Sequence, residues 1–92
     1  MAMNRSDYIE KLEAKLAQSG AEIEKLKAKA AEAKVDARME YQRQIDKLST
    51  KQAAAEKKLE SIREAGVENW EALKDSMNEA LTTLQEEIQR LQ

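Results

Sequence analysis

Apolar residues recur at helical spacing along almost the whole chain. From Ile9 to Ala37 the stripe positions, all apolar except Ser19, follow one another at alternating steps of three and four residues, which is the heptad spacing of a coiled-coil seam. Around Tyr41, and again after Gly66, the steps become four, four and three. Such an eleven-residue unit locally unwinds a left-handed supercoil. The pattern predicts an all-α fold built on a long amphipathic helix of the coiled-coil type. We expect the large apolar contacts of the seam at Ile9, Leu12, Leu16, Ile23, Leu26, Tyr41, Ile45, Leu48, Leu59, Ile62, Trp70, Leu73, Met77, Leu81, Leu84, Ile88 and Leu91.

Gly66 decides between two shapes for this helix. A glycine that ends one helix, followed by Asn69 as the cap of the next, would turn the chain back into a hairpin. The alternative is a single helix that runs through Gly66 as one rod. The apolar stripe crosses Gly66 in phase, as a rod requires, and a glycine inside a helix costs only about 1 kcal/mol relative to alanine. We therefore expect a hairpin or a bend with Gly66 as the hinge. The chain then forms one domain over 1–92, with a helix over about 7–65, a turn or bend over about 65–69, and a helix over about 68–92.

The distribution of charge favours the hairpin. Residues 66–92 carry six acidic side chains but only two basic ones, whereas the segment 25–58 is rich in lysine and arginine. An antiparallel turn at Gly66 would place Leu91 beside Tyr41 and align the acidic segment with the basic one. The short second helix would leave the stripe over 9–37 uncovered. An uncovered stripe predicts self-association into a homodimer or a higher oligomer, or assembly into a filament.

Composition narrows the possible chemistry. Of the 92 residues, 37% are charged and 3% aromatic, and there is no proline, which is typical of long helices. The chain has neither cysteine nor histidine, so it offers no thiolate nucleophile, no disulfide and no imidazole base. Paired carboxylates such as Glu86 and Glu87 lack the glycine-containing acidic loop of a calcium site. We expect a protein that is not an enzyme, with no catalytic residue, no cofactor and no metal.

The same residues bear on two other kinds of partner, nucleic acid and lipid. The basic segment is interspersed with acidic residues, so nucleic acid is an unfavourable partner. The segment after Gly66 is amphipathic, has the spacing of lipid-binding helices, and carries Trp70 as an interfacial anchor, although Lys74 and Arg90 are its only cations. The alternative function is therefore an apolipoprotein-like protein of lipid surfaces or of membrane remodelling, which we favour less. No apolar run is long enough for a membrane span, so we expect a cytoplasmic protein.

A resemblance to a known family adds to this interpretation. The order of Tyr8, Leu12, Leu16, Ile23, Leu26, Tyr41, Ile45, Leu48, Leu59 and the segment Trp70-Glu71-Ala72-Leu73-Lys74 resembles small bacterial coiled-coil proteins described as stress-response proteins. Ser19 and Leu81 stand where such relatives are expected to carry tryptophan. The resemblance implies a helical oligomer linked to stress, without catalytic residues. The expected function is a self-associating coiled-coil structural or interaction protein, a scaffold or filament, whose partner is itself or another helical protein.

Overall fold

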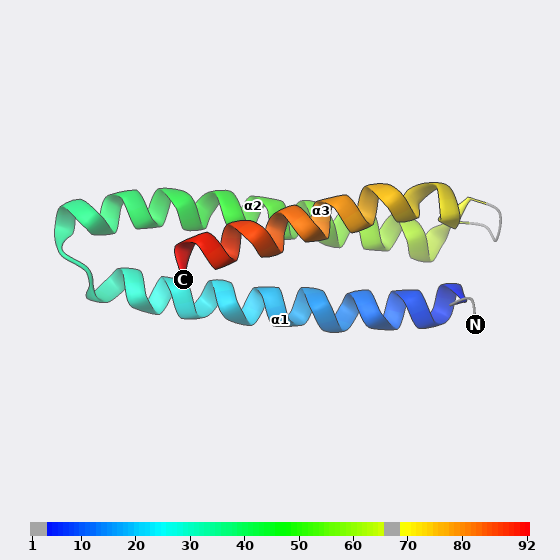
Figure 1. Cartoon of the computed structure of the whole chain (residues 1–92), viewed down its shortest axis with the longest axis horizontal. Coiled ribbons are helices and arrows are strands. Elements are labelled where there is room, and N and C mark those ends of the chain that lie inside the picture. Colours follow the sequence, from blue (N-terminus) through cyan, green and yellow to red (C-terminus); the bar gives the residue numbers. More distant parts are fainter. Residues whose placement is uncertain (1–3, 66–68) are drawn as a thin grey trace.

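The chain forms an elongated bundle of helices. The computed structural model describes residues 4–65 and 69–92, which contain three helices: α1 (Arg5–Glu32), α2 (Val35–Glu64) and α3 (Trp70–Leu91). Helix α2 runs antiparallel to α1, and α3 folds back along both of them (Figure 1). The bundle measures 50 × 19 × 17 Å. The predicted all-α class is confirmed, and so is the return of the C-terminal third as a hairpin against the preceding helix. The hinge predicted at Gly66 lies outside the described residues.

The prediction of one continuous helix over about 7–65 is wrong, because the chain turns at Ala33 and Lys34. Both residues are extended, with φ/ψ of −75°/159° and −64°/154°. Neither glycine nor proline is present, and local propensity alone would continue the helix through alanine and lysine. The gain lies in tertiary packing, because the turn lets the apolar face of α1 close onto α2 and α3. Each leucine or isoleucine that becomes buried contributes about 1.5–3 kcal/mol, which outweighs a helix interrupted at two residues.

Local hydrogen bonds hold this turn. The Ala33 N–H donates to the Ala30 carbonyl at 3.1 Å, and the Arg38 N–H donates to the Lys34 carbonyl at 2.7 Å. The Arg38 guanidinium donates to the Ala33 carbonyl at 3.2 Å. A cation suits the C-terminal end of α1, where carbonyl groups lack helical partners. At the other end of α1, the Asn4 side chain caps the helix by accepting the Asp7 N–H at 2.8 Å.

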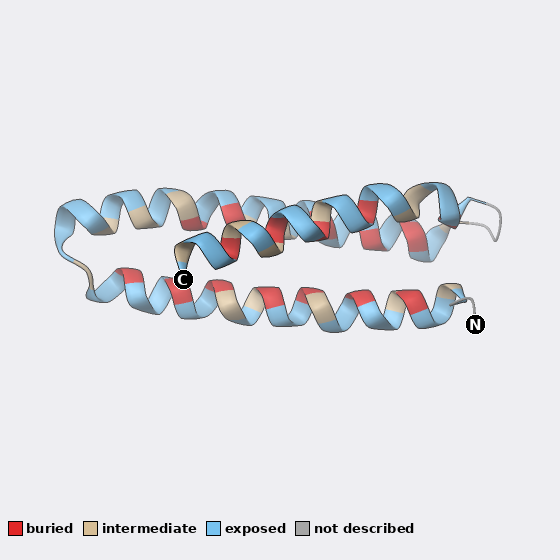
Figure 2. Ribbon diagram, viewed as in Figure 1, coloured by how far each residue is buried: buried red, intermediate tan, exposed pale blue. Residues whose placement is uncertain are grey.

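The core lies where the apolar faces of the three helices meet (Figure 2). Of the predicted seam residues, Ile9, Tyr41, Leu73 and Leu91 are half-buried and pack against the core, and all the others are buried. The core also takes in Tyr8, Ser19, Ala30 and Ala55. The stripe from Leu12 to Ala30 is therefore covered within one chain. This overturns the expectation that the short second helix would leave the stripe over 9–37 open.

Candidate functional site

One end of the bundle is closed by an aromatic cluster that we call the aromatic end, made of Tyr8, Trp70, Lys74 and Asn78. The rings of Tyr8 and Trp70 lie 5.7 Å apart between centroids at 44°. The Lys74 Nζ lies 5.4 Å from the centre of the Tyr8 ring and 5.5 Å from that of Trp70. Both distances are within the range of a cation–π interaction. The Arg5 guanidinium also donates to the Ala65 carbonyl at this end, so α1 is tied to both α2 and α3.

Tyr8 is the core residue that sequence reasoning missed. Its hydroxyl donates to Asn78 Oδ1 at 2.5 Å, and the Lys74 carbonyl oxygen lies 3.3 Å away. Burial, and to a lesser degree the charge of Asp75, raises the pKa of Tyr8 above its ordinary value. The sequence does contain a signal for the burial of Tyr8, because Tyr8 precedes Leu12 by one helical turn, as a seam residue can. We expected Ile9 there, and it is only half-buried.

The seam between α1 and α2 carries polar ties along its length. Arg63 of α2 forms an ion pair with Glu13 of α1 and a second one with Glu60 on its own helix. The hydrogen bonds to Glu13 and Glu60 raise the pKa of Arg63. Midway along the seam, the Gln52 Nε2 donates to the Leu16 carbonyl at 2.8 Å. These contacts fix the register of α1 against α2.

The seam between α2 and α3 is tied at three heights. Lys58 Nζ donates to Ser76 Oγ at 2.6 Å, Lys51 pairs with Glu87, and the Tyr41 hydroxyl donates to the Leu91 carbonyl at 3.1 Å. The contact between Tyr41 and Leu91 matches the antiparallel register expected from the charge distribution. Basic residues of α2 and an acidic residue of α3 meet here, although one exposed pair contributes only about 0–1 kcal/mol.

The seam between α1 and α3 differs from both. Within residues 4–65 and 69–92, the recorded hydrogen bonds and ion pairs between these two helices are those of Tyr8. Farther along, the two helices border a hollow of about 240 Å³. Uncharged amides dominate its lining, which consists of Gln18, Ser19, Glu22, Gln85, Gln89 and Gln92. We call this hollow the glutamine cleft.

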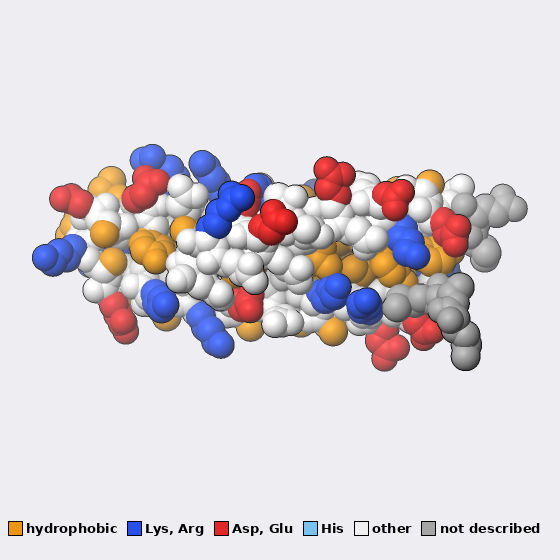
Figure 3. Space-filling model, viewed as in Figure 1, with side chains coloured by type: hydrophobic (Ala, Val, Ile, Leu, Met, Phe, Trp, Pro, Cys, Tyr) orange, Lys and Arg blue, Asp and Glu red, His pale blue; other side chains and the backbone are white. Residues whose placement is uncertain are grey.

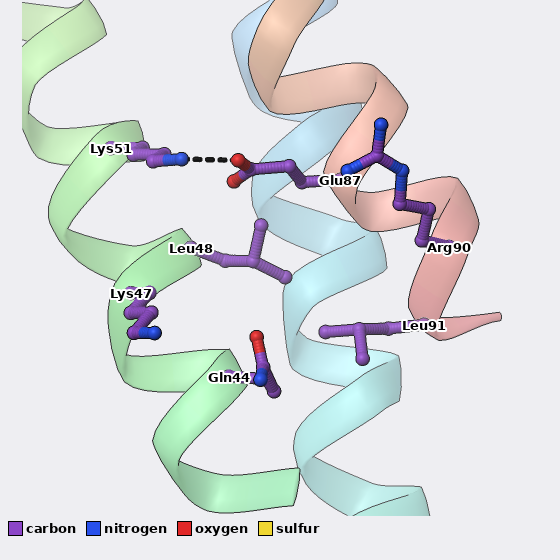
Figure 4. A pocket seen from close by; sticks show the side chains of 7 residues that line it. All are labelled: Gln44, Lys47, Leu48, Lys51, Glu87, Arg90 and Leu91. Atoms are coloured by element: carbon purple, nitrogen blue, oxygen red, sulfur yellow. Dashed lines mark hydrogen bonds and ion pairs between the residues drawn. The ribbon is translucent and has the colours of Figure 1, made fainter.

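A second hollow, of about 230 Å³, lies between α2 and the C-terminal end of α3 (Figure 4). Leu48 and Leu91 form its apolar part, and Gln44, Lys47, Lys51, Glu87 and Arg90 surround them. Lys51 and Glu87 point toward one another across the gap and form the ion pair drawn there. The only carboxylate in the lining is thus already paired with a lysine. The hollow assembles neither an acid–base pair nor a set of metal ligands.

Two further properties of the bundle bear on its chemistry and on its relation to a membrane. In the part of the chain that the structure describes, no group of three acidic side chains gathers as metal ligands could. Within the same ranges, none of the helices combines the length and the apolar character that crossing a membrane requires.

Comparison of the chain with protein-family models, with curated proteins and with solved structures found no match.

Proposed function

We propose that this chain is a non-enzymatic structural or interaction protein that associates with itself through its outer surface. The observation that carries the proposal is the position of two exposed side chains. Among the described residues, Val35 and Met39 are the large hydrophobic side chains that stand exposed, at 64% and 62%. They are four residues apart on α2, so they share one face of the helix. That face lies at the tip of the bundle, where α1 turns into α2 (Figure 1).

The closed core changes where self-association can occur. The seam residues that we expected to join different chains are buried within one chain. Folded copies must therefore meet through surface residues, and the tip supplies apolar ones. The contact expected there is small, and interfaces of modest area are weak or transient. A connection with stress is supported only by the resemblance to stress-response coiled-coil proteins.

Sedimentation equilibrium over a range of protein concentrations tests the proposal. The wild-type protein should show masses above the 10.5 kDa of one chain as concentration rises. Val35→Lys/Met39→Lys should return the mass to that of one chain. Thr50→Lys/Ala53→Lys is the matched control, since both residues are exposed on the same helix and the added charge is the same. A wild-type mass of one chain at every concentration would overturn the proposal, as would a mass unaffected by the change at the tip.

Substitutions in the seam cannot replace this test. Leu16 and Leu26 are 4% and 1% exposed inside the chain. An aspartate at either position would bury an unpaired charge, which strongly destabilises the folded chain itself. A fall in mass would then report unfolding rather than loss of a contact between chains.

A further inference from the structure

The three seams of the bundle are held with unequal strength. An ion pair and two side-chain hydrogen bonds tie α1 to α2, and an ion pair and two hydrogen bonds tie α2 to α3. Between α1 and α3, the recorded polar ties of the described residues are confined to Tyr8 at the aromatic end. On the face where α1 and α3 meet, hydrophobic atoms are visible in a band between the two helices, in the half nearer the N-terminus (Figure 3). This seam shields the core less completely than a continuous row of polar contacts would.

The glutamine cleft weakens the same seam over its second half. Its floor includes Ser19, which is 1% exposed and replaces an apolar residue in the core stripe. Ser19 therefore places a hydroxyl in the core beside the seam that has the fewest ties.

Parting of α1 from α3 would expose one broad apolar face. If the contacts of α2 with both neighbours are kept, the apolar stripes of the three helices come to lie side by side. The exposed layer would include Leu16 and Ile23 of α1, Leu48 of α2, and Met77 and Leu84 of α3, all of which are now buried. A groove of two helices receives one partner helix. A layer three helices wide instead matches a lipid surface, on which amphipathic helices lie flat with their apolar face in the headgroup region.

The charge of the chain favours one kind of lipid, because the net charge is −2 and the acidic excess lies on the segment that contains α3. Glu71, Asp75, Glu79, Glu86 and Glu87 stand against only Lys74 and Arg90 on this helix. An anionic membrane surface would repel such a helix, because surface potential acts on the charges within about a Debye length. A zwitterionic surface carries no such penalty.

We propose that the bundle opens along the seam between α1 and α3 and lays its exposed core on a zwitterionic phospholipid surface. This inference goes beyond self-association, since it uses the buried seam residues and not the tip. The aromatic end is the last tie to break, because Tyr8 must leave Asn78 and Trp70 for the seam to part.

Co-flotation with phosphatidylcholine vesicles tests the opening. The protein should float with these vesicles and not with phosphatidylglycerol vesicles. Trp70, the only tryptophan, should change its emission on binding, because it leaves the ring of Tyr8 on α1. Failure to float with phosphatidylcholine would overturn the inference, and stronger flotation with phosphatidylglycerol would overturn the choice of lipid.

A pair of linked variants tests which seam opens. The chain has no cysteine, so each engineered pair is unique. Gln18→Cys/Gln85→Cys, joined by a short reducible bis-maleimide, closes the seam between α1 and α3 across the glutamine cleft. Lys51→Cys/Glu87→Cys, joined in the same way, is the matched control across the seam between α2 and α3. Helicity and thermal unfolding of both linked proteins should show intact bundles.

The first linked protein should float at least tenfold less than the control, and reduction should restore its flotation. Equal flotation of the two linked proteins would overturn the proposed route of opening. Sedimentation of Val35→Lys/Met39→Lys reports on self-association alone, so either proposal can fail without the other.

Discussion

The two ends of this bundle are built differently. At the aromatic end, three helices meet: Tyr8 of α1 contacts Trp70, Lys74 and Asn78 of α3. Arg5 of α1 donates to the Ala65 carbonyl at the end of α2. At the tip, two helices stand alone, because α2 has 30 residues and α3 only 22. That difference corresponds to about 12 Å at 1.5 Å per residue.

The side chains follow this difference. The stripe at the tip narrows to three alanines, of which Ala30 is buried, Ala33 is half-buried and Ala37 is exposed. Large aromatic groups occur where three helices must be joined, and exposed apolar groups occur where no third helix covers them. The comparison teaches that the size of the seam residues tracks the number of helices that share them. It also predicts that the stability of the bundle is concentrated at the aromatic end.

The largest effect should come from Trp70→Ala. The Trp70 side chain is 6% exposed and contacts Tyr8 and Lys74. Truncation of a buried tryptophan typically costs about 3–5 kcal/mol, which is a large share of the stability of a small domain. Denaturation followed by circular dichroism should show this loss in the free energy of unfolding. A loss below about 1 kcal/mol would mean that the aromatic end does not hold the bundle together.

Tyr8→Phe should have a smaller effect at the same end. The ring contact with Trp70 remains, and the hydrogen bond to Asn78 is lost. The expected cost is about 0.5–1.5 kcal/mol in the free energy of unfolding, with an added part if Asn78 is left without a partner. Tyr41→Phe, which removes the hydrogen bond to the Leu91 carbonyl, is the matched control near the tip. An equal cost at both positions would contradict the contrast between the ends.

The pH dependence of stability offers a second measurement on Tyr8. Burial and Asp75 raise the pKa of Tyr8 in the folded protein, so the fold favours the protonated hydroxyl. This stability is fully present below the ordinary tyrosine pKa of about 10. It is lost as pH rises through the higher pKa of the folded state. The difference in unfolding free energy between wild type and Tyr8→Phe should therefore shrink above about pH 10. A difference that stays constant with pH would show that the ionisation of Tyr8 is not coupled to folding.

Lys34→Pro tests the turn at the tip. Proline requires φ near −65° and an extended preceding residue. Lys34 has φ −64°, and Ala33 has ψ 159°. The substitution should therefore stabilise the chain by about 0.4–1 kcal/mol through the unfolded state. In a helix running through this position it would instead cost about 3 kcal/mol. The sign of the change in melting temperature decides between the two, and Glu24→Pro, inside α1, is a control that should destabilise.

The smallest effect should come from Met39→Lys at the tip. Met39 is 62% exposed, and surface substitutions usually change stability by less than about 0.5 kcal/mol. Thermal unfolding of a dilute solution should hardly change. A large loss would show that Met39 packs against the bundle.

Much of this fold follows from the periodicity of the sequence. Apolar spacing assigns each seam residue to one face of a helix, because a helix repeats every 3.6 residues wherever it lies. The large seam residues between Leu12 and Leu26, and those between Met77 and Ile88, are buried for that reason. The register of Tyr41 against Leu91 follows from charge and from the length of the last helix. The composition by itself excludes cysteine and histidine chemistry.

Other features depended on the tertiary structure. The turn at Ala33 and Lys34 has no glycine or proline to mark it, and the only sequence signal is the lack of large apolar seam residues between Leu26 and Tyr41. Tyr8 and Ile9 are neighbours on α1, and only the position of Trp70 decides which of them is buried. The unequal seams likewise arise from how three helices are placed around one core. Local spacing determines which face of a helix is apolar, whereas the free energy of covering that face determines where the chain must turn and what it meets.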